Sequence, residues 1–102
     1  MDVPGDRTIP EGVLEAPVPN PTAGGSTLGF ALARTGVVEV SVHDVTGRRV
    51  RVLHLGSLPA GRHQVAWDGH ADGGTRVAAG VYFACLGVDG ARAGTRKVTI
   101  LR

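Results

Sequence analysis

The 102-residue sequence lacks features that several classes of protein require: paired cysteines, a long apolar run and a signal peptide. Its one cysteine, Cys85, cannot form an internal disulfide, which excludes a disulfide-stapled scaffold. No apolar run approaches the roughly 18 residues that a membrane-spanning helix needs, so membrane insertion is not expected. No basic segment followed by an apolar stretch marks a signal peptide, and an export signal is therefore expected in a longer parent protein.

Long helices are also disfavoured. Sixteen glycines and six prolines interrupt nearly every stretch of a dozen residues. Hydrophobic residues still make up 42% of the chain, which is enough for a core and argues against a disordered chain. The length fits one domain, so the composition favours a single, turn-rich β fold.

Positive and negative charges are nearly balanced, with a formal net charge of +2. Arginines gather only at Arg48, Arg49 and Arg51, where no aromatic residue is interleaved. Nucleic-acid binding requires a strongly basic surface, commonly with aromatic side chains on which bases stack. The sequence therefore predicts a solvated strand face at this cluster and no nucleic-acid partner.

The residue types of enzyme active sites occur in this chain, but never at the spacing that catalysis requires. No serine lies in a Gly-x-Ser-x-Gly turn, and no pair of histidines has metal-ligand spacing. The histidines are spread along the chain as His43, His54, His63 and His70. We therefore expect no catalytic residue, no cofactor and no enzyme activity.

One acidic loop resembles a calcium-binding loop in part. Asp68 and Asp72 lie in the sequence Asp-Gly-His-Ala-Asp-Gly-Gly. Calcium takes roughly six to eight oxygen ligands, and this loop lacks the further acidic positions and the downstream glutamate of calcium loops. Aspartate and glycine are also the residues of tight β turns. A turn is the preferred interpretation, and a calcium site at these two aspartates the weaker one.

A period of two in the hydrophobic pattern predicts seven β-strands. The predicted strands cover residues 13–16, 26–33, 37–44, 48–55, 62–68, 81–88 and 96–101. Residues 48–55 offer competing core positions, which indicates a bulge or a sheet edge. The start of 81–88 is apolar on both faces and predicts a central strand. Residues 87–94 are predicted to form a turn region, and residues 60–86 a hairpin that carries three of the four aromatics.

Two packed antiparallel sheets bury one face of each such strand. We therefore predict an all-β fold, a seven-stranded antiparallel Ig-like or fibronectin-III-like β-sandwich over residues 13–102, after a flexible arm or linker at residues 1–12. Alternate prolines at 17, 19 and 21 should keep that segment extended and outside a central ladder. Cys85 is expected on the solvated face. The predicted core consists of Leu28, Phe30, Leu32, Val38, Val40, Val42, Val65, Trp67, Tyr82, Leu86, Val98 and Ile100.

Several short motifs follow one another along the chain. They are Pro19-Asn20-Pro21, the run Val40-Ser41-Val42-His43-Asp44-Val45-Thr46-Gly47-Arg48-Arg49-Val50, Ala60-Gly61, Trp67-Asp68-Gly69, Gly80-Val81-Tyr82-Phe83 and the ending Thr95-Arg96-Lys97-Val98-Thr99-Ile100-Leu101-Arg102. In this order and spacing the chain resembles the Ig-like domain of flagellar hook-capping proteins and the C-terminal sorting domains of type IX secretion cargo. The resemblance covers residues 13–102.

The resemblance implies a non-catalytic C-terminal address, which the outer-membrane secretion machinery recognises and which carries a cargo protein, fused in front of it, to the cell surface. Recognition is expected at an accessible strand edge, because unpaired β-edges pair readily with partner strands. The candidate recognition residues are Gly80, Val81, Tyr82, Lys97, Val98, Ile100 and Arg102.

Two other functions stay open at this point. The domain would serve as a structural Ig-like module if it assembled with neighbouring subunits into a filament or adhesin by pairing of β-edges. It would serve as an accessory domain of a surface enzyme if it bound a ligand or calcium. All three hypotheses place the domain outside the cytoplasm, secreted or at the cell surface.

Overall fold

The computed structural model describes residues 12–101 of the chain, which contain seven strands. The strands are β1 (Gly12–Leu14), β2 (Ser26–Leu32), β3 (Gly36–His43), β4 (Arg49–Leu58), β5 (Gly61–Trp67), β6 (Gly80–Val88) and β7 (Ala91–Ile100). Gly12, which the sequence assigned to the arm, begins β1. The rest of the predicted arm and Arg102 lie outside the described residues. The described part contains no helix that could span a membrane.

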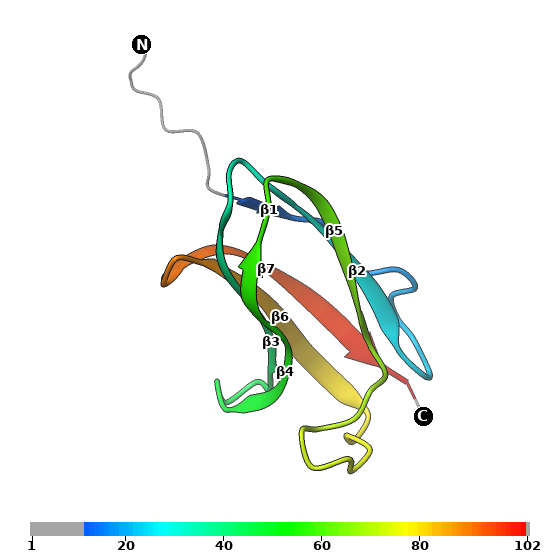
Figure 1. Cartoon of the computed structure of the whole chain (residues 1–102). Helices are drawn as coiled ribbons and strands as arrows, with labels where there is room; N and C mark the ends of the chain where they lie inside the picture. Colours follow the sequence, from blue (N-terminus) through cyan, green and yellow to red (C-terminus); the bar gives the residue numbers. More distant parts are fainter. Residues whose placement is uncertain (1–11, 102) are drawn as a thin grey trace.

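The strands form two antiparallel sheets packed face to face (Figure 1). One sheet has the order β1-β2-β5 and the other the order β4-β3-β6-β7. The predicted all-β Ig-like sandwich is therefore confirmed. The fourth strand pairs with β3, whereas in immunoglobulin constant domains it joins the sheet of the first, second and fifth strands. As predicted, β6 is a central strand.

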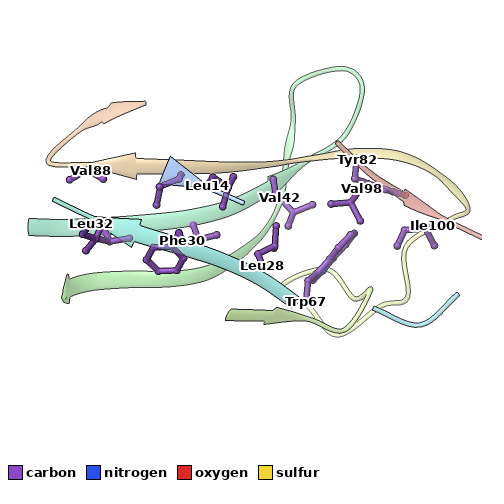
Figure 2. Close-up of a cluster of buried hydrophobic side chains, with 14 residues drawn as sticks. Leu14, Leu28, Phe30, Leu32, Val42, Trp67, Tyr82, Val88, Val98 and Ile100 are labelled. Carbon is purple, nitrogen blue, oxygen red and sulfur yellow. The ribbon is translucent and has the colours of Figure 1, made fainter. Parts of the chain in front are cut away.

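The core lies between the sheets, where alternate side chains of each strand meet (Figure 2). Eleven of the twelve residues proposed for the core are buried, with relative exposures of 8% or less. Val65 is the exception, since it is only partly buried and packs against the cluster from one side. Leu14, Ala84 and Val88 complete the buried cluster, although the predicted core omitted them.

The fourth strand shows the irregularity that its competing core positions indicated. It is an edge strand, and its register against β3 shifts twice, between Val40 and Ser41 and between Val42 and His43. The two extra residues on β4 are Val50 and Leu53, and both pack against the core while staying partly exposed. A bulge lets two residues on one strand oppose one on its neighbour, which reconciles the competing positions.

The predicted turn region at 87–94 was wrong, because β7 begins at Ala91 and the turn is only two residues long. Asp89 and Gly90 both have positive φ, at 52° and 85°. An Asp-Gly pair in this conformation makes the tight turn whose twist matches that of the flanking strands. The strand β4 likewise runs three residues further than predicted, to Leu58.

The predicted hairpin over residues 60–86 was also wrong, because β5 and β6 belong to different sheets. Residues 68–79 cross from one sheet to the other. The indole of Trp67 donates a hydrogen bond to the carbonyl oxygen of His70 at 2.9 Å, and the Tyr82 hydroxyl donates to the carbonyl oxygen of Ala78 at 2.7 Å. The latter bond has the form of the tyrosine corner of Ig-like folds. The two rings meet edge to face, 5.5 Å apart.

We predict that Leu28→Ala lowers the free energy of unfolding by about 3 kcal/mol, because it leaves a cavity at a fully buried position. Leu55→Ala is the matched control, since Leu55 is 68% exposed and its loss should cost less than about 0.5 kcal/mol. Urea unfolding followed by tryptophan fluorescence measures both. Equal losses for the two variants would contradict the assignment of the core.

Candidate functional site

The candidate site is the edge of the four-stranded sheet formed by β7 and its neighbour β6. The structure brings the proposed recognition residues from Gly80 to Ile100 together there, because Gly80 pairs with Ile100 and Tyr82 with Val98, while Arg102 lies outside the described residues. Gly80 and Lys97 are exposed, and Val81 is partly buried. The side chains of Tyr82, Val98 and Ile100 point into the core (Figure 2). Lys97 and Val81 can therefore present side chains to a partner and Gly80 only its backbone, while Tyr82, Val98 and Ile100 act through packing.

The outer edge of β7 is not free, contrary to the expectation of an accessible edge at this strand. The side chain of Asn20 donates from Nδ2 to the carbonyl oxygen of Lys97 at 2.9 Å and accepts at Oδ1 from the amide of Thr99 at 2.9 Å. The backbone of Thr22 then pairs with the Thr99 carbonyl and the Leu101 amide, at 2.9 and 2.7 Å. The edge from Lys97 to Leu101 is therefore occupied by the chain's own residues 20–22.

The proline-rich segment reaches this position by leaving the other sheet. Val18 still pairs with Thr27 of β2, and four residues later Thr22 pairs in parallel with Ile100 of β7. Prolines 19 and 21 cannot donate backbone hydrogen bonds, so the Asn20 amide side chain supplies the donor that the backbone lacks. Proline keeps this segment out of a regular ladder, as the sequence predicted, but the segment still closes a sheet edge.

Part of the opposite edge, at β4, is covered in a similar way. The backbone amide of Asp72 donates to the carbonyl oxygen of Val50 at 3.0 Å. The side-chain Oδ1 of Asp72 accepts from the amide of Val52 at 3.0 Å. Arg51 reinforces this contact by donating to the carbonyl oxygen of His70 at 3.1 Å. Asp72 thus covers the β4 edge at Val50 and Val52 as Asn20 covers the β7 edge at Lys97 and Thr99. Nothing in the local sequence of either residue indicates the strand that it caps.

The two aspartates considered for calcium have other roles in the fold. Asp68 accepts a hydrogen bond from the amide of His70 at 3.0 Å and lies 3.3 Å from Arg51 Nη1. Asp72 Oδ1, which already accepts from a β4 amide, lies 3.9 Å from Arg51 Nε. The hydrogen bond from the His70 amide, followed by the charge of Arg51, holds the pKa of Asp68 below its usual value. Within residues 12–101 no group of three or more His, Cys, Asp or Glu side chains could hold a metal ion.

A shallow groove follows the outer face of the four-stranded sheet. Ser41 and Cys85 lie side by side in register on its floor, and Ser41 Oγ is hydrogen-bonded to His43 Nε2 at 2.9 Å. His43 Nδ1 faces a backbone carbonyl, that of Gly47, at 3.4 Å, where a catalytic triad would have a carboxylate. Ser41 is also only 5% exposed. The pair is best explained as a buried hydroxyl satisfied by a neighbouring imidazole.

These features define an Ig-like β-sandwich module that has a tyrosine corner and lacks a disulfide between its sheets, since Cys85, the one cysteine, is free. The chain belongs to the family of FlgD Ig-like domains, whose sequence pattern matches residues 18–84. The predicted resemblance to hook-capping proteins is thereby confirmed. A search of curated proteins found no significant match.

Solved structures show the same fold in several settings. FlgD from Xanthomonas campestris, whose structure is linked to the hook capping that is essential for flagellar assembly, is 27% identical, with a TM-score of 0.60, covering 89% of this chain and 67% of that one. PorU from Porphyromonas gingivalis is 23% identical, with a TM-score of 0.68, covering 91% of this chain. PorZ of the same bacterium, a surface component of the type IX secretion system, is 22% identical, with a TM-score of 0.50, covering 89% of this chain.

The chain spans only 10% of PorU and 11% of PorZ. In these large proteins the sandwich is therefore one small module among others. At these levels of identity the likeness to PorU and PorZ concerns the fold.

We predict that Asn20→Leu loosens the β7 edge, because it removes both side-chain hydrogen bonds to β7. The free energy of unfolding should fall by about 1 kcal/mol. The amide of Thr99 should exchange with deuterium faster, while the amide of Leu101, bonded to Thr22, stays protected. Asn20→Asp is the matched variant, because it keeps the acceptor for Thr99. Unchanged exchange at Thr99 in Asn20→Leu would show that Asn20 does not cap the edge.

A second prediction from this site concerns the stability of the fold at acid pH. The pKa of Asp68 is lowered in the fold, so near and below its ordinary value of 3.8 the unfolded chain binds more protons than the folded chain. Stability is therefore present above that value and is lost as the pH falls through the folded-state pKa. Asp44, whose pKa is lowered mainly by the Thr46 hydroxyl, behaves likewise.

Asp68→Asn should flatten the acid limb of the curve of unfolding free energy against pH, and Asp44→Asn combined with it should flatten the curve further. Urea titrations at a series of pH values measure the slope. The idea fails if the single variant, the double variant and the original chain have the same slope.

Proposed function

We propose that this chain is a non-catalytic sorting and interaction module that directs a parent protein, fused in front of it, through the type IX secretion route to the cell surface. The observation that carries the proposal is the membership in the FlgD Ig-like family together with the small share of PorU and PorZ that the fold occupies. A domain of this kind acts as an attachment or address within a larger protein, and the chemistry belongs to the remainder.

The surface that would be read includes the exposed part of the β6–β7 edge. Lys97, which pairs with Phe83 of β6, carries a solvated charge there, and the exposed Gly80 begins β6 opposite Ile100. Tyr82, Val98 and Ile100 would contribute by holding these two strands in place rather than by contact. Because Asn20 and Thr22 occupy the backbone of this edge, a partner would recognise side chains and turns here rather than add a strand.

The test is a reporter protein with the 102-residue chain fused to its C-terminus, expressed in a host that has the type IX machinery. We expect the reporter at the cell surface, measured by protease accessibility of intact cells. Trp67→Ala, which removes a core side chain, should abolish export because the folded domain is what is recognised. Retention of the unaltered fusion in the periplasm would overturn the proposal.

The same assay locates the recognition surface. Lys97→Glu should lower export about tenfold, the effect of losing roughly 1.4 kcal/mol of binding free energy. Arg92→Glu is the matched control, since it reverses an exposed charge at the other end of the same strand. Equal export of both variants would place recognition elsewhere on the domain.

A further inference from the structure

Within residues 12–101, one sheet edge is uncovered along its whole length, whereas each of the others is covered at least in part. The β7 edge is covered from Lys97 to Leu101 by Asn20 and Thr22, and the β4 edge is bulged twice and covered at Val50 and Val52 by Asp72. The β1 edge is three residues long and faces β7, where Arg96 Nε donates to the Leu14 carbonyl oxygen at 2.8 Å. In contrast, β5 pairs with β2 along all seven residues without a bulge, and no other strand pairs with its outer side.

The backbone groups on this outer side can be identified from the register. Thr27 of β2 exchanges hydrogen bonds with Val18, and Gly29 accepts from Glu15, so these residues point away from β5. Backbone groups alternate in direction along a strand, so the even-numbered residues of β2 bond to β5. Their partners on β5 are odd-numbered. The N–H and C=O groups of Arg62, Gln64 and Ala66 therefore face outward, and within residues 12–101 no group bonds to them.

The side of the sandwich next to this edge also leaves part of the core uncovered. Val65 of β5 and Val50, Leu53 and Leu58 of β4 pack against the core while remaining partly exposed. On the opposite side, between β1 and β7, Leu14 and Val98 are buried. The β5 side thus combines free backbone groups with half-exposed apolar side chains, and both features favour an added strand.

We infer that this edge docks a second copy of the chain, β5 against β5 in antiparallel register about a two-fold axis at Gln64. In this register Gln64 faces Gln64 of the second copy, and Arg62 faces Ala66. No like charges oppose each other, and Arg62 is already neutralised by Glu15 at 2.6 Å. Val65 would meet His63 of the second copy, which covers part of its exposed surface. The three-stranded sheets of the two copies would become one six-stranded sheet.

This register is self-complementary, which is the requirement of a closed dimer rather than an open filament. The outward side chains of Arg62, Gln64 and Ala66 are all exposed in the single chain. Substitution of Gln64 therefore changes the contact between the copies without disturbing the core or the bonds between β5 and β2. The inference does not depend on the proposed role in export.

The experiment is sedimentation equilibrium of the 102-residue chain from micromolar to millimolar concentration, together with charge variants at the two-fold axis. We expect a monomer–dimer equilibrium. Gln64→Lys and Gln64→Glu should each weaken the dimer about fivefold, because each places like charges opposite one another. An equimolar mixture of the two variants should associate at least as tightly as the unaltered chain. Thr95→Lys, which adds the same charge on β7, should have no effect.

Amide hydrogen exchange identifies the edge directly. As the concentration rises, the outward amides of Arg62, Gln64 and Ala66 should gain protection, while those of His63 and Val65, which already bond to β2, should not change. A chain that stays monomeric at millimolar concentration overturns the inference. So does a dimer that Gln64→Lys leaves unchanged, or one in which the Gln64 amide gains no protection.

Discussion

Unpaired backbone groups at the edges of an open β-sandwich must be satisfied by something, and the structure of this chain depends on how each edge is treated. The two edges of the four-stranded sheet are each covered, over part of their length, by a polar residue that offers a donor and an acceptor to the edge strand. Asn20 offers both a donor and an acceptor to β7, and Asp72 offers an amide and a carboxylate oxygen to β4. Water or a partner satisfies the outward backbone groups of β5, which are uncovered along the whole strand.

The edge caps also connect the two sheets, which no disulfide links. The segment around Asn20 leaves β2 in one sheet and ends on β7 in the other. The crossing at residues 68–79 begins with Trp67 in one sheet, touches β4 through Asp72, and ends at the Tyr82 corner in the other. Each connection therefore supports the packing of the core and also covers part of a sheet edge. A substitution at Asn20 or Asp72 should affect core packing as well as the edge.

Much of the fold could be predicted because its signals are local. Alternation of apolar residues marked the strands, and the crowded pattern at 48–55 indicated the bulged edge strand that β4 proves to be. The main wrong prediction concerns which strands pair with one another. The Trp67–Tyr82 segment has the pattern of a hairpin, but periodicity does not say whether two strands share a sheet. The Asp89-Gly90 turn was placed too broadly, although its Asp-Gly pair is a local signal.

The sequence by itself determined the strands, most of the core and the family. The alternation of apolar residues in a strand and the glycine or aspartate of a turn can both be recognised within a few consecutive residues. Only the tertiary structure decided which edges are open. Asn20 meets Lys97 and Asp72 meets Val52 across long stretches of chain, and such contacts exist only once the sheets have packed. For the same reason, the seven residues of β5 do not by themselves predict that its outer edge is exposed.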